Sequence, residues 1–76
     1  MSAPETARVG VPIEASEQDL GRIRYDAAGL VVTIVQEASS KDVLMVAYMD
    51  AEALRRTLDS GRTWFFSRSR QEYWLK

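Results

Sequence analysis

Two nearly continuous apolar runs, joined by a short polar segment, constrain the fold of this 76-residue chain more than any other feature. Residues 30–36 read Leu-Val-Val-Thr-Ile-Val-Gln and residues 43–49 read Val-Leu-Met-Val-Ala-Tyr-Met. Such runs, rich in β-branched and bulky side chains, are typical of strands, and residues 38–42 have the length of a hairpin loop. We predict two strands that are buried on both faces and pair antiparallel.

A helix is predicted between Asp50 and Gly61. Asp50 is a good N-cap, and Met49 and Leu54 stand at the two positions of a hydrophobic staple. Leu54 and Leu58 form the stripe that we expect to face inward. Gly61 can adopt the left-handed conformation that ends many helices.

The remaining elements complete an α+β fold. Residues 63–67 and 73–75 predict a third and a fourth strand, and Ser16 can cap a short helix. Residues 1–15 lack periodicity and are interpreted as a flexible leader, which leaves residues 16–76 as the folded part. We expect a small mixed, largely antiparallel sheet of three to four strands with one covering helix. One helix cannot cover two apolar faces, so the domain is predicted to be incomplete without a downstream segment or a dimer partner.

Composition excludes several kinds of chemistry. The chain has no cysteine and no histidine, so it offers no thiol nucleophile, no Cys/His zinc site and no histidine-based triad. No apolar run approaches the roughly 20 residues that span a bilayer. Residues 1–16 contain two glutamates and no apolar core, unlike a signal peptide, and the expected location is cytoplasmic without a membrane partner.

Charge is distributed unevenly along the chain. Residues 55–76 carry six basic and two acidic side chains, a net charge of +4, whereas residues 1–54 carry four basic and nine acidic ones. A local positive field at the C-terminal end favours an anionic ligand. The alternative for Arg55 and Arg56 is that they only solvate the predicted helix.

The segment Ser67-Arg68-Ser69-Arg70 is the most site-like part of the sequence. Aromatic residues on both sides of it indicate an ordered turn, and an extended backbone would place both guanidiniums on one side, where they suit a phosphate. Structural ion pairs or simple surface exposure remain alternatives. Trp74 could stack on a nucleobase or belong to the core or an interface.

Three other side chains have simple structural interpretations. Gln36 ends an apolar strand; it could orient a ligand, but it is expected to hold a neighbouring loop by hydrogen bonding. Tyr48 is predicted to lie in the core with its hydroxyl at the margin. Asp50 is explained by its role as a helix cap, and no other acidic residues are paired as in a carboxylate dyad or a metal site.

Taken together in order and spacing, ten short segments resemble phosphoribosyl-AMP cyclohydrolase of histidine biosynthesis, over residues 20–76 and as the N-terminal part of that family's domain. The segments are Gly29-Leu30, Ile34-Val35-Gln36, Val43-Leu44-Met45, Ala47-Tyr48-Met49, Ala53-Leu54, Thr57-Leu58, Gly61, Ser67-Arg68-Ser69-Arg70, Trp74 and Lys76.

The resemblance implies a cytoplasmic, homodimeric hydrolase that uses zinc and magnesium to open the adenine ring of 1-(5-phosphoribosyl)-AMP at the N1–C6 bond. It implies a small nucleotide as ligand, not a nucleic acid. The substrate-binding residues that it implies are Ser67, Arg68, Ser69, Arg70, Trp74 and Lys76. No catalytic or metal residue transfers, because the family's metal-binding motifs and cysteines are absent from these 76 residues, and the chain alone is expected to be inactive. The alternatives are a non-catalytic module that binds anions or nucleotides, and a dimerisation fragment.

Overall fold

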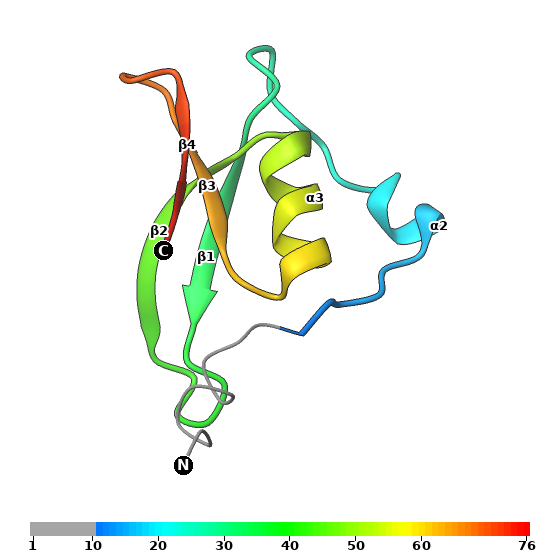
Figure 1. Cartoon of the computed structure of the whole chain (residues 1–76), viewed down its shortest axis with the longest axis vertical. Coiled ribbons are helices and arrows are strands. Elements are labelled where there is room, and N and C mark those ends of the chain that lie inside the picture. The colour runs from blue at the N-terminus through cyan, green and yellow to red at the C-terminus, as the bar shows by residue number, and fades with distance from the viewer. Residues whose placement is uncertain (1–10) are drawn as a thin grey trace.

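Four strands and two helices make up the described part of the chain, residues 11–76 of a computed structural model. The order is α2 (Glu17–Leu20), β1 (Val31–Gln36), β2 (Val43–Met49), α3 (Ala51–Ser60), β3 (Trp64–Ser67) and β4 (Glu72–Leu75). Figure 1 shows α3 between the strands and α2, so a single substantial helix covers one side of the strands. The α+β class with one covering helix is therefore confirmed. In residues 11–76, neither helix has the length and apolar character needed to cross a membrane.

The β1–β2 hairpin is antiparallel as predicted, with Val31 opposite Met49 and Ile34 opposite Val46. Burial alternates along β1, where Val32 and Ile34 are 57% and 62% exposed. The prediction that these strands are buried on both faces is wrong within this chain, because only one face has a helix against it. The uncovered apolar face that we inferred from the sequence is thus confirmed. Its exposed members are Val32, Ile34, Val43, Leu44 and Val46, here called the outer face.

The second strand pair, β3 and β4, is also antiparallel, and the strands form two separate two-stranded ladders. The expected four strands are present, but β2 and β3 pack together without forming one continuous sheet. The core between the ladders and α3 consists of Met49, Ala53 and Phe65, of which Ala53 and Phe65 are fully buried.

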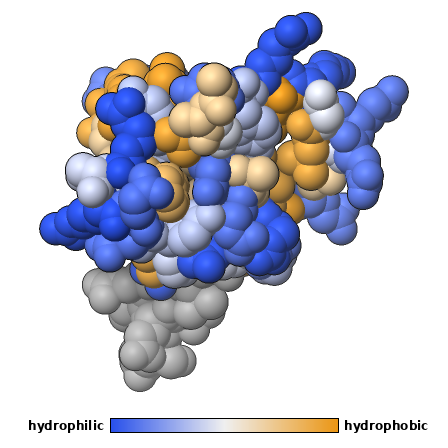
Figure 2. Space-filling model, turned by 90° about the horizontal axis from the view of Figure 1, so that it is seen from above, coloured by the Kyte–Doolittle hydropathy of each residue, from blue (hydrophilic) through white to orange (hydrophobic). Residues whose placement is uncertain are grey.

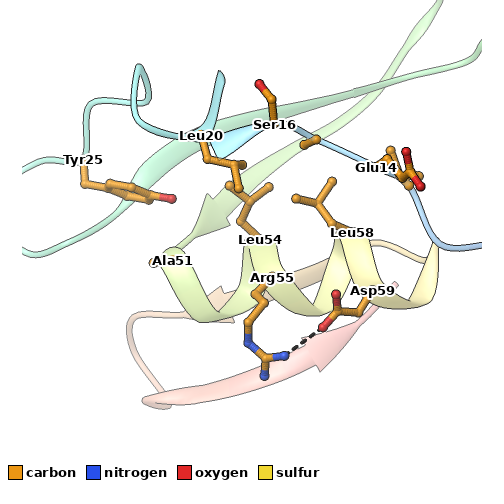
Figure 3. A pocket seen from close by; sticks show the side chains of 11 residues that line it. Glu14, Ser16, Leu20, Tyr25, Ala51, Leu54, Arg55, Leu58 and Asp59 are labelled. Carbon is orange, nitrogen blue, oxygen red and sulfur yellow. Dashed lines mark hydrogen bonds and ion pairs between the residues drawn. The ribbon is translucent and has the colours of Figure 1, made fainter. Parts of the chain in front are cut away.

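Helix α3 begins and ends where the sequence predicts. The Asp50 Oδ1 accepts a hydrogen bond from the Ala53 amide at 2.8 Å, and Gly61 takes a left-handed φ of 73°. The side of the helix that faces the core is centred on Ala53, however, and not on the two leucines. Leu54 touches the core only in part, and Leu54 and Leu58 point toward α2 in Figure 3. The expected leucine stripe therefore lies mainly beneath the N-terminal segment.

Residues 11–20 run along this leucine side of α3. The Ile13 amide donates a hydrogen bond to the Leu58 carbonyl at 2.7 Å, and Ser16 caps α2 by accepting from the Asp19 amide at 3.0 Å, as predicted. The segment and α3 enclose a groove of about 890 Å³. The leader predicted for residues 1–15 falls largely on residues 1–10, which lie outside the described part of the chain.

Two glycines with positive φ provide a matched test of this packing. Gly29 (φ 81°) has open space where a Cβ would stand, whereas a Cβ at Gly61 would overlap the backbone oxygen of Val11. We expect Gly29→Ala to lower the free energy of unfolding by about 1 kcal/mol, the ordinary cost of a left-handed alanine. Gly61→Ala should cost roughly 2–3 kcal/mol because the N-terminal segment must also move. Urea denaturation measures both, and equal losses would show that Val11 does not pack on Gly61.

Candidate functional site

The segment that stood out in the sequence forms a closed turn between β3 and β4. The Gln71 amide donates to the Ser67 carbonyl at 2.8 Å, and the Arg70 amide donates to Ser67 Oγ at 3.2 Å. Gln71 adopts a left-handed φ of 55°, and its Nε2 donates to the Arg68 carbonyl at 2.8 Å. The turn is ordered by its own side chains, as the flanking aromatic residues predicted.

The two arginines of this turn have different environments. The guanidinium carbon of Arg68 lies 4.2 Å from the centroid of the Tyr48 ring, on β2. Arg70 instead pairs with Glu72, with Nη1 3.2 Å from Oε2, and both side chains are exposed. The backbone at 68–70 is a turn and not extended, so the alternation that would place both guanidiniums on one side does not apply.

A shallow groove of about 580 Å³ lies between β2 and the β3–β4 turn. Four of the six residues that the resemblance implied line it, whereas Arg70 and Lys76 do not. The lining residues are Val46, Ala47, Tyr48, Phe66, Ser67, Arg68, Ser69 and Trp74. The groove therefore combines three aromatic side chains, two serine hydroxyls and one guanidinium, which are groups suited to a ligand with an aromatic ring and a negative charge.

Trp74 takes part in both the core and the groove. Its ring centroid lies 4.7 Å from that of Phe65, with the planes tilted by 33°. The indole is half-buried, so one side is fixed by packing while other atoms line the groove. The core interpretation of Trp74 is therefore confirmed in part, and stacking on a nucleobase stays a prediction. Lys76 continues the ladder, since its amide donates to the Thr63 carbonyl at 2.9 Å, and it is exposed.

A contact beside the groove was not expected from the sequence. The Tyr73 hydroxyl donates to Asp50 Oδ2 at 2.6 Å, so the residue that caps α3 also holds β4. The adjacent carboxylate disfavours the tyrosinate and raises the pKa of Tyr73 to about 12. Asp50 therefore does more than cap a helix. The helix-capping role of Asp50 can be predicted from neighbouring residues in the sequence. The position of Tyr73 next to Asp50 depends on the register between β3 and β4 and could not be predicted in that way.

Arg55 and Arg56 are held on the surface of α3 by Glu52. Nη2 of Arg55 lies 2.6 Å and Nε of Arg56 2.9 Å from Oε2 of Glu52, and these two hydrogen bonds lower the pKa of Glu52 to about 2. The Arg56 guanidinium also lies over the rings of Tyr73 (4.3 Å) and Trp64 (5.2 Å). Arg56 is thus part of the packing between α3 and the β3–β4 ladder and not only a solvating charge.

Gln36 holds the hairpin loop, as the sequence predicts. Gln36 Nε2 donates to the Lys41 carbonyl at 2.8 Å, which confirms its predicted role in holding the hairpin loop.

Among the described residues, no three His, Cys, Asp or Glu side chains lie close enough to hold a metal ion. With no cysteine or histidine in the sequence, these residues do not fit the zinc that the resemblance implied, and without a cluster of carboxylates residues 11–76 do not fit the magnesium.

A family model and several curated relatives match this chain, and all of them carry names from histidine biosynthesis or its phosphoribosyl-AMP cyclohydrolase step. Residues 45–76 match the family described as Phosphoribosyl-AMP cyclohydrolase. The chain is 66% identical over 55 residues to the phosphoribosyl-AMP cyclohydrolase of Renibacterium salmoninarum, covering 72% of this chain and 42% of that protein. It is 49% identical over all 76 residues to the enzyme of that name from Rhodopseudomonas palustris, covering 51% of it.

A third relative is named as a bifunctional protein. The histidine biosynthesis bifunctional protein HisIE of Thermosynechococcus vestitus is 53% identical over 66 residues, which cover 87% of this chain and 31% of that protein. The chain thus spans about half or less of the length of these curated relatives. The groove lies entirely within the stretch that the family model matches, since all its lining residues fall between 46 and 74.

Proposed function

Because this chain belongs to the phosphoribosyl-AMP cyclohydrolase family, we propose that it supplies the nucleotide-binding wall of an enzyme that hydrolyses the N1–C6 bond of 1-(5-phosphoribosyl)-AMP. The observation that carries this proposal is the groove, which brings Ser67, Arg68, Ser69 and Trp74 together. The guanidinium and the hydroxyls can donate hydrogen bonds to a phosphate, and the indole can stack on the adenine ring.

Within this proposal, Arg68 is the residue that meets a phosphate. Its side chain lines the groove, whereas the Arg70 guanidinium is paired with Glu72 on the exposed turn. We therefore assign Arg70 and Lys76, which do not line the groove, to the periphery of the proposed site. Any zinc and magnesium of the reaction would need ligands beyond those that residues 11–76 bring together.

The proposed assembly is a cytoplasmic homodimer. What supports it is the outer face, whose five apolar side chains are between 52% and 62% exposed. Monomeric proteins rarely leave a contiguous apolar face uncovered. Figure 2 shows apolar side chains interrupting the hydrophilic surface both on the strand side and on the α2 side of the molecule.

Binding of AMP tests the proposed function, because AMP carries both an adenine and a 5′-phosphate. We expect AMP to change the tryptophan fluorescence of the 76-residue chain at a fixed ionic strength. Arg68→Ala should weaken AMP binding by about 10- to 100-fold, which corresponds to the 1–3 kcal/mol of a charge-assisted hydrogen bond. Arg70→Ala is the matched control and should change the affinity by less than about 2-fold, because an exposed ion pair contributes little.

Two results would contradict the proposal. If AMP and single-stranded DNA bind equally well and both affinities fall steeply with salt, the chain is a general anion-binding module. If Arg68→Ala leaves the AMP affinity unchanged, the groove is not the phosphate site. The chain alone, assayed with 1-(5-phosphoribosyl)-AMP and added zinc and magnesium, should show no ring opening, and turnover would show that its own residues suffice.

A further inference from the structure

Tyr48 was expected to be an ordinary core residue, yet its ring lies directly beneath the Arg68 guanidinium. The guanidinium carbon is 4.2 Å from the ring centroid, well inside the roughly 6 Å range of a cation–π contact. Tyr48 belongs to β2, where it pairs with Val32, and Arg68 belongs to the β3–β4 turn. The contact therefore joins the two walls of the groove.

The electrostatic environment of Arg68 differs from that of the other arginines near the site. Arg55, Arg56 and Arg70 each pair with a carboxylate. Within residues 11–76, Arg68 forms no ion pair and its guanidinium donates no hydrogen bond. Its side chain is held by the face of an aromatic ring instead.

A stacked guanidinium differs in its chemistry from a paired one. Stacking uses the face of the guanidinium plane, whereas the N–H donors lie along its edge. An arginine held by a ring is therefore fixed in place while all its donors stay available to a planar or tetrahedral anion. A carboxylate partner would compete for those donors, and an unsupported arginine would lose more side-chain freedom on binding.

We propose that Tyr48 is a positioning residue for anion binding: its ring holds the Arg68 guanidinium against the groove wall with the N–H edge directed to the phosphate of the bound nucleotide. This inference rests on the proposed function and extends it to a residue outside the turn. The ring performs this role and the hydroxyl does not. Tyr48→Phe should therefore behave like the unsubstituted chain, whereas Tyr48→Leu, which keeps an apolar side chain but has no ring, should not.

The test is a double-mutant cycle measured with AMP and with adenosine. Tyr48→Leu should weaken AMP binding by about 3- to 10-fold, the range expected for a lost cation–π contact, while Tyr48→Phe stays within about 2-fold. In an Arg68→Ala background, Tyr48→Leu should have no further effect. Adenosine, which has no phosphate, should bind the Tyr48→Leu variant and the unsubstituted chain equally well. A loss of AMP affinity without a loss of adenosine affinity separates positioning of Arg68 from a general loss of structure.

Several outcomes would overturn the inference. Equal losses of AMP and adenosine affinity would make Tyr48 a structural or base-contacting residue. A loss that persists in the Arg68→Ala background would show that Tyr48 does not act through Arg68. Circular dichroism checks the fold of each variant. Tyr48→Val, which favours a strand, replaces Tyr48→Leu if the leucine variant does not fold.

Failure of the proposed function gives a different result. If the unsubstituted chain does not bind AMP, the nucleotide assignment fails, and inorganic pyrophosphate becomes the probe for the Tyr48–Arg68 pair. The same coupling between the two substitutions is then expected for pyrophosphate. Its absence with both AMP and pyrophosphate overturns the inference about Tyr48.

Discussion

Asp50→Ala is expected to lower the free energy of unfolding by about 3 kcal/mol, a large share of what a domain of this size has. Two interactions are lost together. The cap on the Ala53 amide at 2.8 Å contributes about 1 kcal/mol, and the bond from the Tyr73 hydroxyl at 2.6 Å, to a charged acceptor, contributes roughly 1.5–3 kcal/mol. Urea denaturation followed by circular dichroism measures the loss.

Two further variants separate these contributions. Tyr73→Phe removes the hydroxyl and keeps the cap, and Asp50→Asn keeps a good cap while removing the charge. The Asp50→Ala and Tyr73→Phe losses should not add in the double variant, because both remove the same hydrogen bond. Strict additivity would mean that the Asp50–Tyr73 contact contributes nothing.

The same contact predicts a dependence on alkaline pH. The pKa of Tyr73 is raised from 10.0 to about 12 in the folded chain, mainly by the hydrogen bond to Asp50. A raised pKa means that the stabilisation is fully present below pH 10 and is lost as the pH rises through about 12. In Asp50→Asn, the ultraviolet absorbance step of Tyr73 should move down toward 10.

Replacing Ile34 and Val46 together with threonine should weaken self-association of the chain by roughly 1000-fold, if the outer face is the dimer contact proposed above. The two side chains are direct cross-strand partners and are 62% and 58% exposed. Each substitution removes about 1 kcal/mol of apolar burial, and a symmetric dimer counts each one twice, which gives about 4 kcal/mol.

Threonine keeps the β-branch that suits a strand, so the hairpin itself should persist. Val11→Thr is the matched control, because Val11 is 73% exposed but lies on the N-terminal segment. Sedimentation velocity over a concentration series measures the association. A monomeric unsubstituted chain, or unchanged association in the double variant, would remove the outer face from the proposed interface.

The parts of this structure that follow from short-range rules could be predicted from the sequence. The cap at Asp50, the left-handed end at Gly61 and the hydrogen bond of Gln36 to its loop depend only on residues within about one helical turn or one hairpin loop. The uncovered apolar face could also be predicted. Two strands that are apolar on both faces need a packed element against each face, and the sequence predicts only one strong helix.

The parts that depend on register and packing could not be predicted. The cation–π contact of Arg68 with Tyr48 joins residues 20 positions apart, and the hydrogen bond from Tyr73 to Asp50 joins residues 23 positions apart. The alternation argument for Arg68 failed because an extended backbone was assumed where the chain turns. The leucine stripe of α3 was placed wrongly because the sheet-facing position belongs to the small Ala53, which allows close approach of helix and strands.

The hydrogen bond between Asp50 and Tyr73 also has a consequence for synthesis on the ribosome. Helix α3 can form within microseconds once its ten residues have left the exit tunnel. The hydrogen bond that joins its N-cap to β4 cannot form until Tyr73, 23 residues after Asp50, has also been made. Tyr73 follows Ser60 by 13 residues, so at roughly 5–20 residues per second a nascent chain spends about 0.7–2.6 seconds with α3 complete but not yet bonded to β4. During that interval the buried side of the helix, with Ala53 at its centre, is open to chaperones and to other nascent chains.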